Sequence, residues 1–218
     1  MKLLTLESTN KICSVAIKNN KQINFLYKFS YNNHSQIIMS IINKILLKTS
    51  ISLKEIDYIA VSIGPGSFTG IRISINIAHG FSTGLNIPLI GISTLKILAE
   101  QAKRKTLYKN FIIVIQANKK KIYWGKYFFN NKKWNLKKKE LYISYKSALK
   151  KIQKTKKKWK IIGNLNSYIL KKINLNQFIP NINYPKALDM IPLALKDIKN
   201  KKKIQKIILP NYLNNKFI

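Results

Sequence analysis

The residues whose spacing has the clearest chemical meaning form a glycine-rich stretch between two apolar segments. The stretch consists of Gly64, Pro65, Gly66, Ser67, Phe68, Thr69, Gly70, Ile71 and Arg72. An apolar run over 58–63 precedes it and an apolar, helix-like run follows it, so the pattern predicts a strand-to-helix turn. Glycines allow such a turn to be tight and to bring backbone N–H groups close to another group.

Two phosphate-binding glycine motifs do not fit this spacing. A P-loop has four residues between its glycines and then Lys and Ser or Thr, whereas Gly64 and Gly70 have five residues between them and Ile71 follows. A dinucleotide fingerprint has a glycine three residues after Gly66, where this chain has Thr69. On spacing alone, a structural role in the turn and a binding role both stay open.

Acidic residues and histidines are scarce, which restricts the catalytic chemistry available to the chain. They are Glu7, Glu55, Asp57, Glu100, Glu140, Asp189, Asp197, His34 and His79. General acid–base pairs and metal sites draw on these residue types, and no cluster of them has metal-ligand spacing. We therefore expect no metal site and no catalytic residue in this chain.

The charge of the chain is strongly unbalanced. Its 218 residues include 41 Lys or Arg against 7 Asp or Glu, which gives a formal net charge of +34. Such a charge attracts phosphate polyanions over long distances. Lys, Ile and Asn share A/T-rich codons, however, so codon drift and selection for binding a polyanion both remain open explanations.

Composition also limits the class of protein. A hydrophobic share of 46% is typical of a folded globular chain. Cys13 is the single cysteine, which excludes an intramolecular disulfide and favours a cytoplasmic location. No run approaches the roughly 18 apolar residues that a membrane span needs, so we expect no membrane association.

Hydrophobic periodicity predicts the elements that position the glycine stretch. The first half reads as three strands, a helix, a strand, a helix, a strand and a helix over 2–6, 12–18, 22–29, 34–48, 58–63, 70–84, 88–92 and 94–103. The second half repeats this order of strands and helices less clearly, over 111–116, 122–129, 134–144, 147–154, 159–162 and 187–199. We expect an N-terminal subdomain over 1–103 and a smaller one over 104–218, in an α/β or α+β protein.

Several motifs resemble the TsaB (YeaZ) family of tRNA threonylcarbamoyladenosine biosynthesis proteins. The stretch 64–72 resembles the family's glycine signature, and 1–9 resembles its opening strand. The segments 88–95 and 210–213 resemble later landmarks of the family. The resemblance covers nearly the whole chain and implies the actin-like ATPase (ASKHA) fold, an α/β fold with two related sheet-and-helix subdomains, the second one reduced.

The resemblance implies a scaffold rather than an enzyme. TsaB proteins bind and activate the paralogue TsaD, which transfers a threonylcarbamoyl group to the adenosine beside the tRNA anticodon. The implied partners are TsaD in a heterodimer, the ATPase TsaE, tRNA through the complex, and a second copy when TsaD is missing. Because the family uses two helices for pairing, we predict an interface at His34, Ile38, Ile41, Ile42, Ile45, Ser74 and Ala78.

The resemblance also identifies three residues that would meet a nucleotide. Glu7 stands where the family usually has Asp on the first strand, and Gln116 stands where it commonly has Asp in the second half. Gly163 belongs to a reduced adenosine-side glycine motif. A neutral amide is a weaker Mg²⁺ ligand than a carboxylate, so we expect no cofactor beyond a weak ATP or ADP contact.

Two other function classes stay open as alternatives. One is a degenerate ATP-dependent enzyme or peptidase of the same superfamily. The metal-binding His-x-x-x-His pair of TsaD is missing, because Ile38 stands four residues after His34. The other is a general RNA-binding protein, which net charge alone supports.

Overall fold

The computed structural model describes residues 1–30, 33–201 and 204–213, and these divide into two compact units. Unit 1 consists of Met1–Ile97 and Pro185–Asn211, and unit 2 of Leu98–Tyr184 with Tyr212 and Leu213. The expected boundary after residue 103 therefore differs from the observed one, which lies within helix α3 (Thr94–Lys105). The segment Pro185–Asn211, expected in the second subdomain, returns to unit 1.

Unit 1 contains a six-stranded mixed sheet. Its strands are β1 (Lys2–Glu7), β2 (Ile12–Asn19), β3 (Gln22–Phe29), β4 (Tyr58–Ser62), β5 (Leu89–Ile92) and β11 (Ile204–Gln205). The strand order is β11-β5-β4-β1-β2-β3, with β1, β4 and β5 parallel and the other three antiparallel to their neighbours. The carboxyl ends of β1 and β4 therefore lie at the same edge, and the residues that follow both strands meet there.

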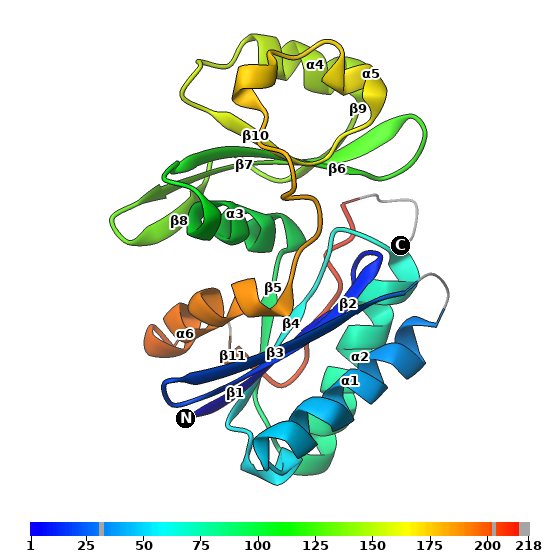
Figure 1. Ribbon diagram of the computed structural model, residues 1–218, viewed down its shortest axis with the longest axis vertical. Coiled ribbons are helices and arrows are strands. Elements are labelled where there is room, and N and C mark those ends of the chain that lie inside the picture. The colour runs from blue at the N-terminus through cyan, green and yellow to red at the C-terminus, as the bar shows by residue number, and fades with distance from the viewer. Residues whose placement is uncertain (31–32, 202–203, 214–218) are drawn as a thin grey trace. The chain divides into compact units, whose positions relative to one another are not determined.

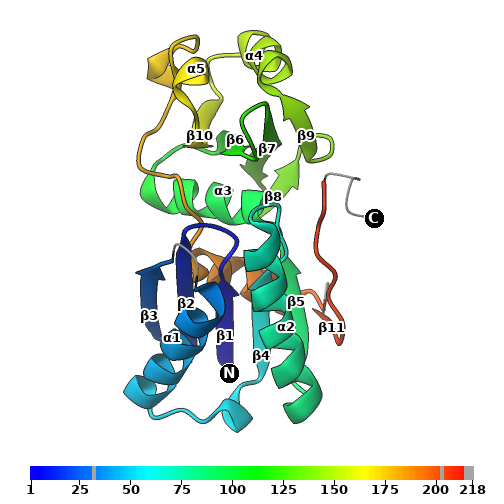
Figure 2. The same ribbon diagram turned by 90° about the vertical axis from the view of Figure 1, so that its right-hand side faces the viewer.

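Helices cover both faces of this sheet (Figures 1 and 2). One face packs against α1 (His34–Thr49) and α2 (Phe68–Leu85). In the chain, the short turn η1 (Leu53–Glu55) and strand β4 lie between these two helices. The other face packs against the 3₁₀ turn η3 (Ala187–Met190) and α6 (Ile191–Lys199). The Thr5 hydroxyl donates to the Ala187 carbonyl at 2.9 Å, which attaches the returning segment to β1.

Unit 2 contains a five-stranded sheet with helices α4 (Tyr145–Gln153) and α5 (Ser167–Leu170). Its strands are β6 (Asn110–Gln116), β7 (Lys121–Asn130), β8 (Lys133–Leu136), β9 (Leu141–Ser144) and β10 (Lys160–Asn164). The order is β10-β6-β7-β8, and β9 also pairs with β7. The 3₁₀ turn η2 (Leu175–Gln177) follows α5.

The predicted elements of the first half are confirmed with small shifts at their ends. Ser52 and Glu55 form a capping box at the start of η1. The single strand expected over 134–144 is wrong, because β8 and β9 pair with different parts of β7 and are separated by 137–140. The helix expected over 187–199 begins as the turn η3, and Pro192 lies at the start of α6. The two-residue strand β11 was not predicted, since pairing across the sheet defines it.

Candidate functional site

The glycine stretch is bonded to the turn between β1 and β2 of the same unit. The Ser67 N–H donates to the Thr9 carbonyl at 2.8 Å. In return, the Ser8 hydroxyl donates to the Gly70 carbonyl at 2.8 Å. The group that the sequence predicted to lie close to this loop is therefore the chain's own β1–β2 turn.

Close approach explains why glycines stand at these positions. A Cβ atom on Gly66 would lie 2.4 Å from the Thr9 carbonyl oxygen, and one on Gly70 would lie 2.0 Å from the Ser8 carbonyl oxygen. Gly64 has φ +96°, a backbone conformation that L side chains rarely adopt. The loop thus has a structural role in joining two turns at the carboxyl edge of the sheet.

The rest of the stretch starts helix α2. The Ser67 hydroxyl is the N-cap and accepts from the Gly70 N–H at 3.2 Å. The Arg72 guanidinium lies over the Phe68 ring, 3.8 Å from its centroid. Phe68 is 37% exposed and Thr69 is exposed, whereas Pro65 is buried. The exposed part of the loop is therefore the first turn of α2, not the glycines.

Glu7 is the candidate nucleotide residue on β1, and it is fully buried. Its Oε1 accepts from the Thr9 N–H at 2.7 Å and from the Thr9 hydroxyl at 2.6 Å. Its Oε2 is buried without a hydrogen-bond partner among the described residues. Burial raises the pKa of Glu7, and the Ser62 hydroxyl and the hydrogen bonds from Thr9 offset this only in part. Because burial disfavours its charged form, this carboxyl group is a poor ligand for Mg²⁺.

The other two nucleotide candidates lie in unit 2. Gln116 is exposed at the end of β6. Gly163 lies in β10, which runs parallel to β6, with φ +113°, and a Cβ atom there would lie 2.0 Å from the Val114 carbonyl oxygen. The close approach of the two strands is sufficient to explain this glycine.

Histidine and acidic side chains form no obvious reactive group in the part of the chain that the structure describes. Within it, no three His, Cys, Asp or Glu side chains lie close enough together to hold a metal ion. His34 Nε2 lies 3.0 Å from the Asn10 carbonyl oxygen, which attaches the start of α1 to the β1–β2 turn. His79 Nε2 accepts from the Ile208 N–H at 3.0 Å. Both rings are thus engaged with backbone groups of unit 1.

The residues predicted to line a partner interface are mostly in the core of unit 1. Six of them are at most 5% exposed: Ile38, Ile41, Ile42, Ile45, Ser74 and Ala78. His34 is the seventh and is half-buried. Five of these positions are corrected, because their side chains are packed inside unit 1 and are 0% exposed. Ile41 is 5% exposed and contributes to the surface pocket described below. The sequence showed the apolar stripe of each helix but not that one sheet covers both stripes.

The outward faces of the same helices carry different residues. On α1, Met39 is 36% exposed and Leu47 is 81% exposed. On α2, Gly80 and Gly84 are exposed, and no described atom lies within 4 Å of a Cβ built on either. The interface predicted from sequence did not include Leu47.

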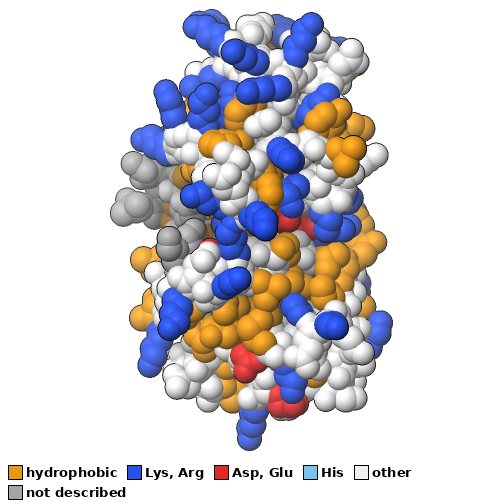
Figure 3. All heavy atoms as spheres, turned by 90° about the vertical axis from the view of Figure 1, so that its left-hand side faces the viewer, with side chains coloured by type: hydrophobic (Ala, Val, Ile, Leu, Met, Phe, Trp, Pro, Cys, Tyr) orange, Lys and Arg blue, Asp and Glu red, His pale blue; other side chains and the backbone are white. Residues whose placement is uncertain are grey.

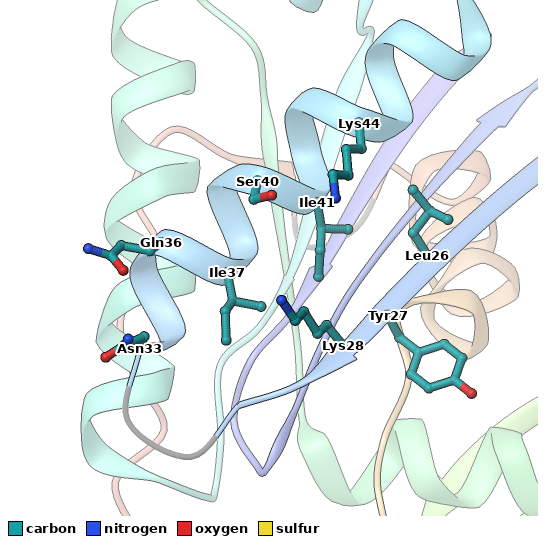
Figure 4. A pocket seen from close by; sticks show the side chains of 9 residues that line it. All are labelled: Leu26, Tyr27, Lys28, Asn33, Gln36, Ile37, Ser40, Ile41 and Lys44. Atoms are coloured by element: carbon teal, nitrogen blue, oxygen red, sulfur yellow. The ribbon is translucent and has the colours of Figure 1, made fainter.

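A surface pocket of about 520 Å³ lies between β3 and α1 (Figure 4). Ile37 and Ile41 of α1 and Leu26 of β3 supply its apolar side chains, and Lys28 and Lys44 extend toward it from the two elements. Residues 31 and 32, between these elements, lie outside the described residues. The described residues that line it include the hydroxyl groups of Tyr27 and Ser40 but no His, Cys, Asp or Glu side chain.

Lysine dominates the surface. Figure 3 shows a face on which Lys and Arg side chains are widely spread and acidic side chains are few. In the described part of the chain, Glu55 forms a salt bridge with Lys2 and Glu100 forms one with Lys103. Among the described residues, no helix is both long enough and apolar enough to cross a bilayer.

Comparisons with known proteins agree on one family. Residues 27–209 match the family model described as TsaD, tRNA N6-adenosine threonylcarbamoyltransferase. A protein of Buchnera aphidicola subsp. Acyrthosiphon pisum is 39% identical over 219 residues, covering 99% of this chain and 98% of its own. A protein of Escherichia coli K12 is 30% identical and covers 89% of this chain and 86% of its own. Both are named tRNA threonylcarbamoyladenosine biosynthesis protein TsaB.

Two crystal structures from Pseudomonas aeruginosa share the fold. One, described as an uncharacterized protein with similarity to peptidase YeaZ, has a TM-score of 0.87 at 24% identity and covers 98% of this chain and 99% of its own. The other, YeaZ, has a TM-score of 0.86 at 25% identity and covers 97% and 99%. The predicted actin-like α/β fold is thereby confirmed.

Proposed function

The chain belongs to the TsaB family, and from this premise we propose that it is a non-catalytic subunit that binds and activates TsaD in the synthesis of N6-threonylcarbamoyladenosine on tRNA. The observation that carries the proposal is the identity to TsaB proteins along nearly the full length of both chains. The fold supports it, since the chain and its YeaZ neighbours superimpose over almost every residue.

The state of Glu7 supports a subunit without its own catalysis. The carboxyl group is buried, hydrogen-bonded to Thr9 and shifted toward its neutral form. A phosphoryl-transfer enzyme needs an ionised carboxylate to hold Mg²⁺. We therefore propose that the chain requires no cofactor, and that any ATP or ADP contact at Glu7, Gln116 or Gly163 is weak.

The outward faces of α1 and α2 are the surface that we propose for TsaD. Met39 and Leu47 expose apolar area on α1, and Phe68 does so at the start of α2. Gly80 and Gly84 leave open space above α2, which would let a partner helix approach its backbone closely. The same surface would pair two copies of this chain when TsaD is missing. TsaE and tRNA join through the complex, in the cytoplasm.

Co-elution with TsaD tests the proposal. The experiment measures the molar mass of the chain, alone and mixed with TsaD from the same source, by gel filtration with light scattering. We expect a stable mixed complex, and formation of threonylcarbamoyladenosine on tRNA only when this chain is present. Well-folded TsaD that neither binds the chain nor depends on it would contradict the proposal.

A pair of leucine variants locates the surface. Leu47→Glu places a charge at an 81% exposed position on α1, and we expect it to weaken TsaD binding at least about tenfold. Leu175→Glu is the matched control, because Leu175 is 65% exposed and belongs to unit 2 and to neither helix. Equal affinity of the two variants for TsaD would show that the surface on α1 is wrongly assigned.

A further inference from the structure

Unit 2 contains a pocket of about 240 Å³ that is lined mainly by lysines. Six of its nine lining residues are lysines: Lys126, Lys137, Lys138, Lys139, Lys151 and Lys154. They come from three segments, namely β7, the connection between β8 and β9, and the end of α4 with the residue that follows it. Of the described residues that line the pocket, none is acidic. The fold thus gathers positive charge that is separated in the sequence.

Lys126 is the anchored member of this lysine pocket. Its Nζ lies 4.2 Å from the centroid of the Trp159 ring and donates to the Thr155 hydroxyl at 3.3 Å. Burial, and to a lesser degree the nearby Lys137, lower the pKa of Lys126. An ammonium group has three N–H donors, so this one retains capacity for an anion that would also relieve the repulsion by Lys137.

In the part of the chain that the structure describes, the pocket lysines have no acidic partner. Among the described residues, none of the six forms a salt bridge. Glu140, the acid nearest in sequence to Lys137–Lys139, accepts a hydrogen bond from the Tyr127 hydroxyl at 2.6 Å. Tyr127 follows Lys126 in β7, and successive strand residues point to opposite faces of the sheet. The Tyr127 ring that engages Glu140 is therefore on the face opposite Lys126.

We propose that this lysine pocket binds phosphate groups of an RNA strand. The chemistry fits, because ammonium groups donate hydrogen bonds and phosphate oxygens only accept them. Trp124, in the floor of the pocket, is 5% exposed, so it offers no ring face on which a base could stack. The contacts hold the backbone and carry no sequence information. The choice of RNA as the polyanion rests on the proposed function in tRNA modification, while the site itself rests on the lysines.

Two lysine triples with equal loss of charge test the site. The pocket triple replaces the exposed Lys137, Lys139 and Lys151 by Gln, and the control triple replaces the exposed Lys119, Lys120 and Lys146, which do not line the pocket. The probe is an unmodified tRNA transcript, and its binding to this chain alone is followed by fluorescence anisotropy across a salt series. Circular dichroism checks that all three proteins are folded.

We expect the pocket triple to weaken tRNA binding at least about tenfold at low salt, and to reduce the slope of log K against log salt by about 2 to 3. We expect the control triple to change affinity less than about threefold. Equal losses in the two triples would overturn the site, because net charge alone would then explain binding. Displacement of tRNA by polyglutamate at equal charge would also overturn the proposal, because this result would favour an acidic protein segment as the ligand of the pocket. Failure of TsaD to bind would refute the proposed function and leave this result untouched.

Discussion

Among single residues, Glu7 shows how a position with a familiar chemistry can have a structural role. The superfamily pattern places a carboxylate there for a metal ion, yet this carboxyl accepts two hydrogen bonds from Thr9 and is fully buried. Desolvation penalises its charged form and raises its pKa. The Glu7 side chain thus contributes most to the stability of the folded state when it is neutral.

Glu7→Gln tests this interpretation through the pH dependence of stability. The pKa of Glu7 is raised in the folded state, so its contribution to stability is complete below the pKa of the unfolded state, about 4.3. This contribution is lost as the pH rises through the pKa of the folded state. The amide stays neutral, so the variant should gain stability relative to the natural protein between pH 4.5 and pH 8. Urea unfolding at the two pH values measures the difference.

Glu55→Gln is the control with the opposite sign. Glu55 is exposed and accepts a hydrogen bond from the Lys2 ammonium group, which lowers the pKa of Glu55. A group with a lowered pKa stabilises the fold at pH values above its pKa in the unfolded state, and this stabilisation is lost as the pH falls. Glu55→Gln should therefore be the less stable protein at pH 8 and approach the natural protein toward low pH. The same pH trend in both variants would contradict the assignment for Glu7.

At the scale of the elements, α2 has two different faces that both carry glycine. Gly70 begins the inward face, where the helix meets the β1–β2 turn and a Cβ atom would lie 2.0 Å from the Ser8 carbonyl oxygen. Gly80 is on the outward face, with open space around it. One glycine is there for a backbone contact inside unit 1, and the other leaves room above the helix.

Alanine at the two positions should change stability in opposite directions. Gly70→Ala forces the turn away from the helix and should lower the free energy of unfolding by about 1–3 kcal/mol. Gly80→Ala should raise it by about 0.5–1 kcal/mol, because alanine favours the helix and nothing is displaced. Chemical denaturation measures both. Destabilisation by Gly80→Ala would show that its open space is not available in solution.

For the molecule as a whole, net charge is the dominant electrostatic feature. With 41 basic residues against 7 acidic ones, most lysines on this surface repel other lysines. The six lysines of the pocket in unit 2 are one concentrated instance. The folded chain should therefore respond to ions more strongly than a balanced protein of its size.

Added sodium chloride should stabilise the protein. Salt shortens the screening length from about 30 Å at 0.01 M to about 8 Å at 0.15 M, which reduces repulsion in the compact state. Each kcal/mol of repulsion removed should raise Tm by about 2–4 °C. A thermal scan at the two salt concentrations measures the effect, with potassium chloride as the control for ion identity. A Tm that stays constant or falls would contradict self-repulsion as a significant cost.

Local pattern was sufficient for much of the fold. Strand alternation, the isoleucine stripe of α1 and the capping box at Ser52 depend on near neighbours in the chain, so they could be predicted from sequence. The glycine stretch predicted a turn and a family, because glycine spacing directly reflects allowed backbone conformations. The lysine excess predicted affinity for polyanions without a location.

The tertiary structure decided which of these features is surface and which is core. Ile41 and Leu47 belong to one apolar pattern, yet the sheet of unit 1 buries the first and leaves the second 81% exposed. The return of the chain from Pro185 to unit 1 and the gathering of lysines from three segments are equally long-range. Local sequence determines the conformation of a segment, but burial and charge clustering depend on what other segments pack against it, and only the folded chain specifies that.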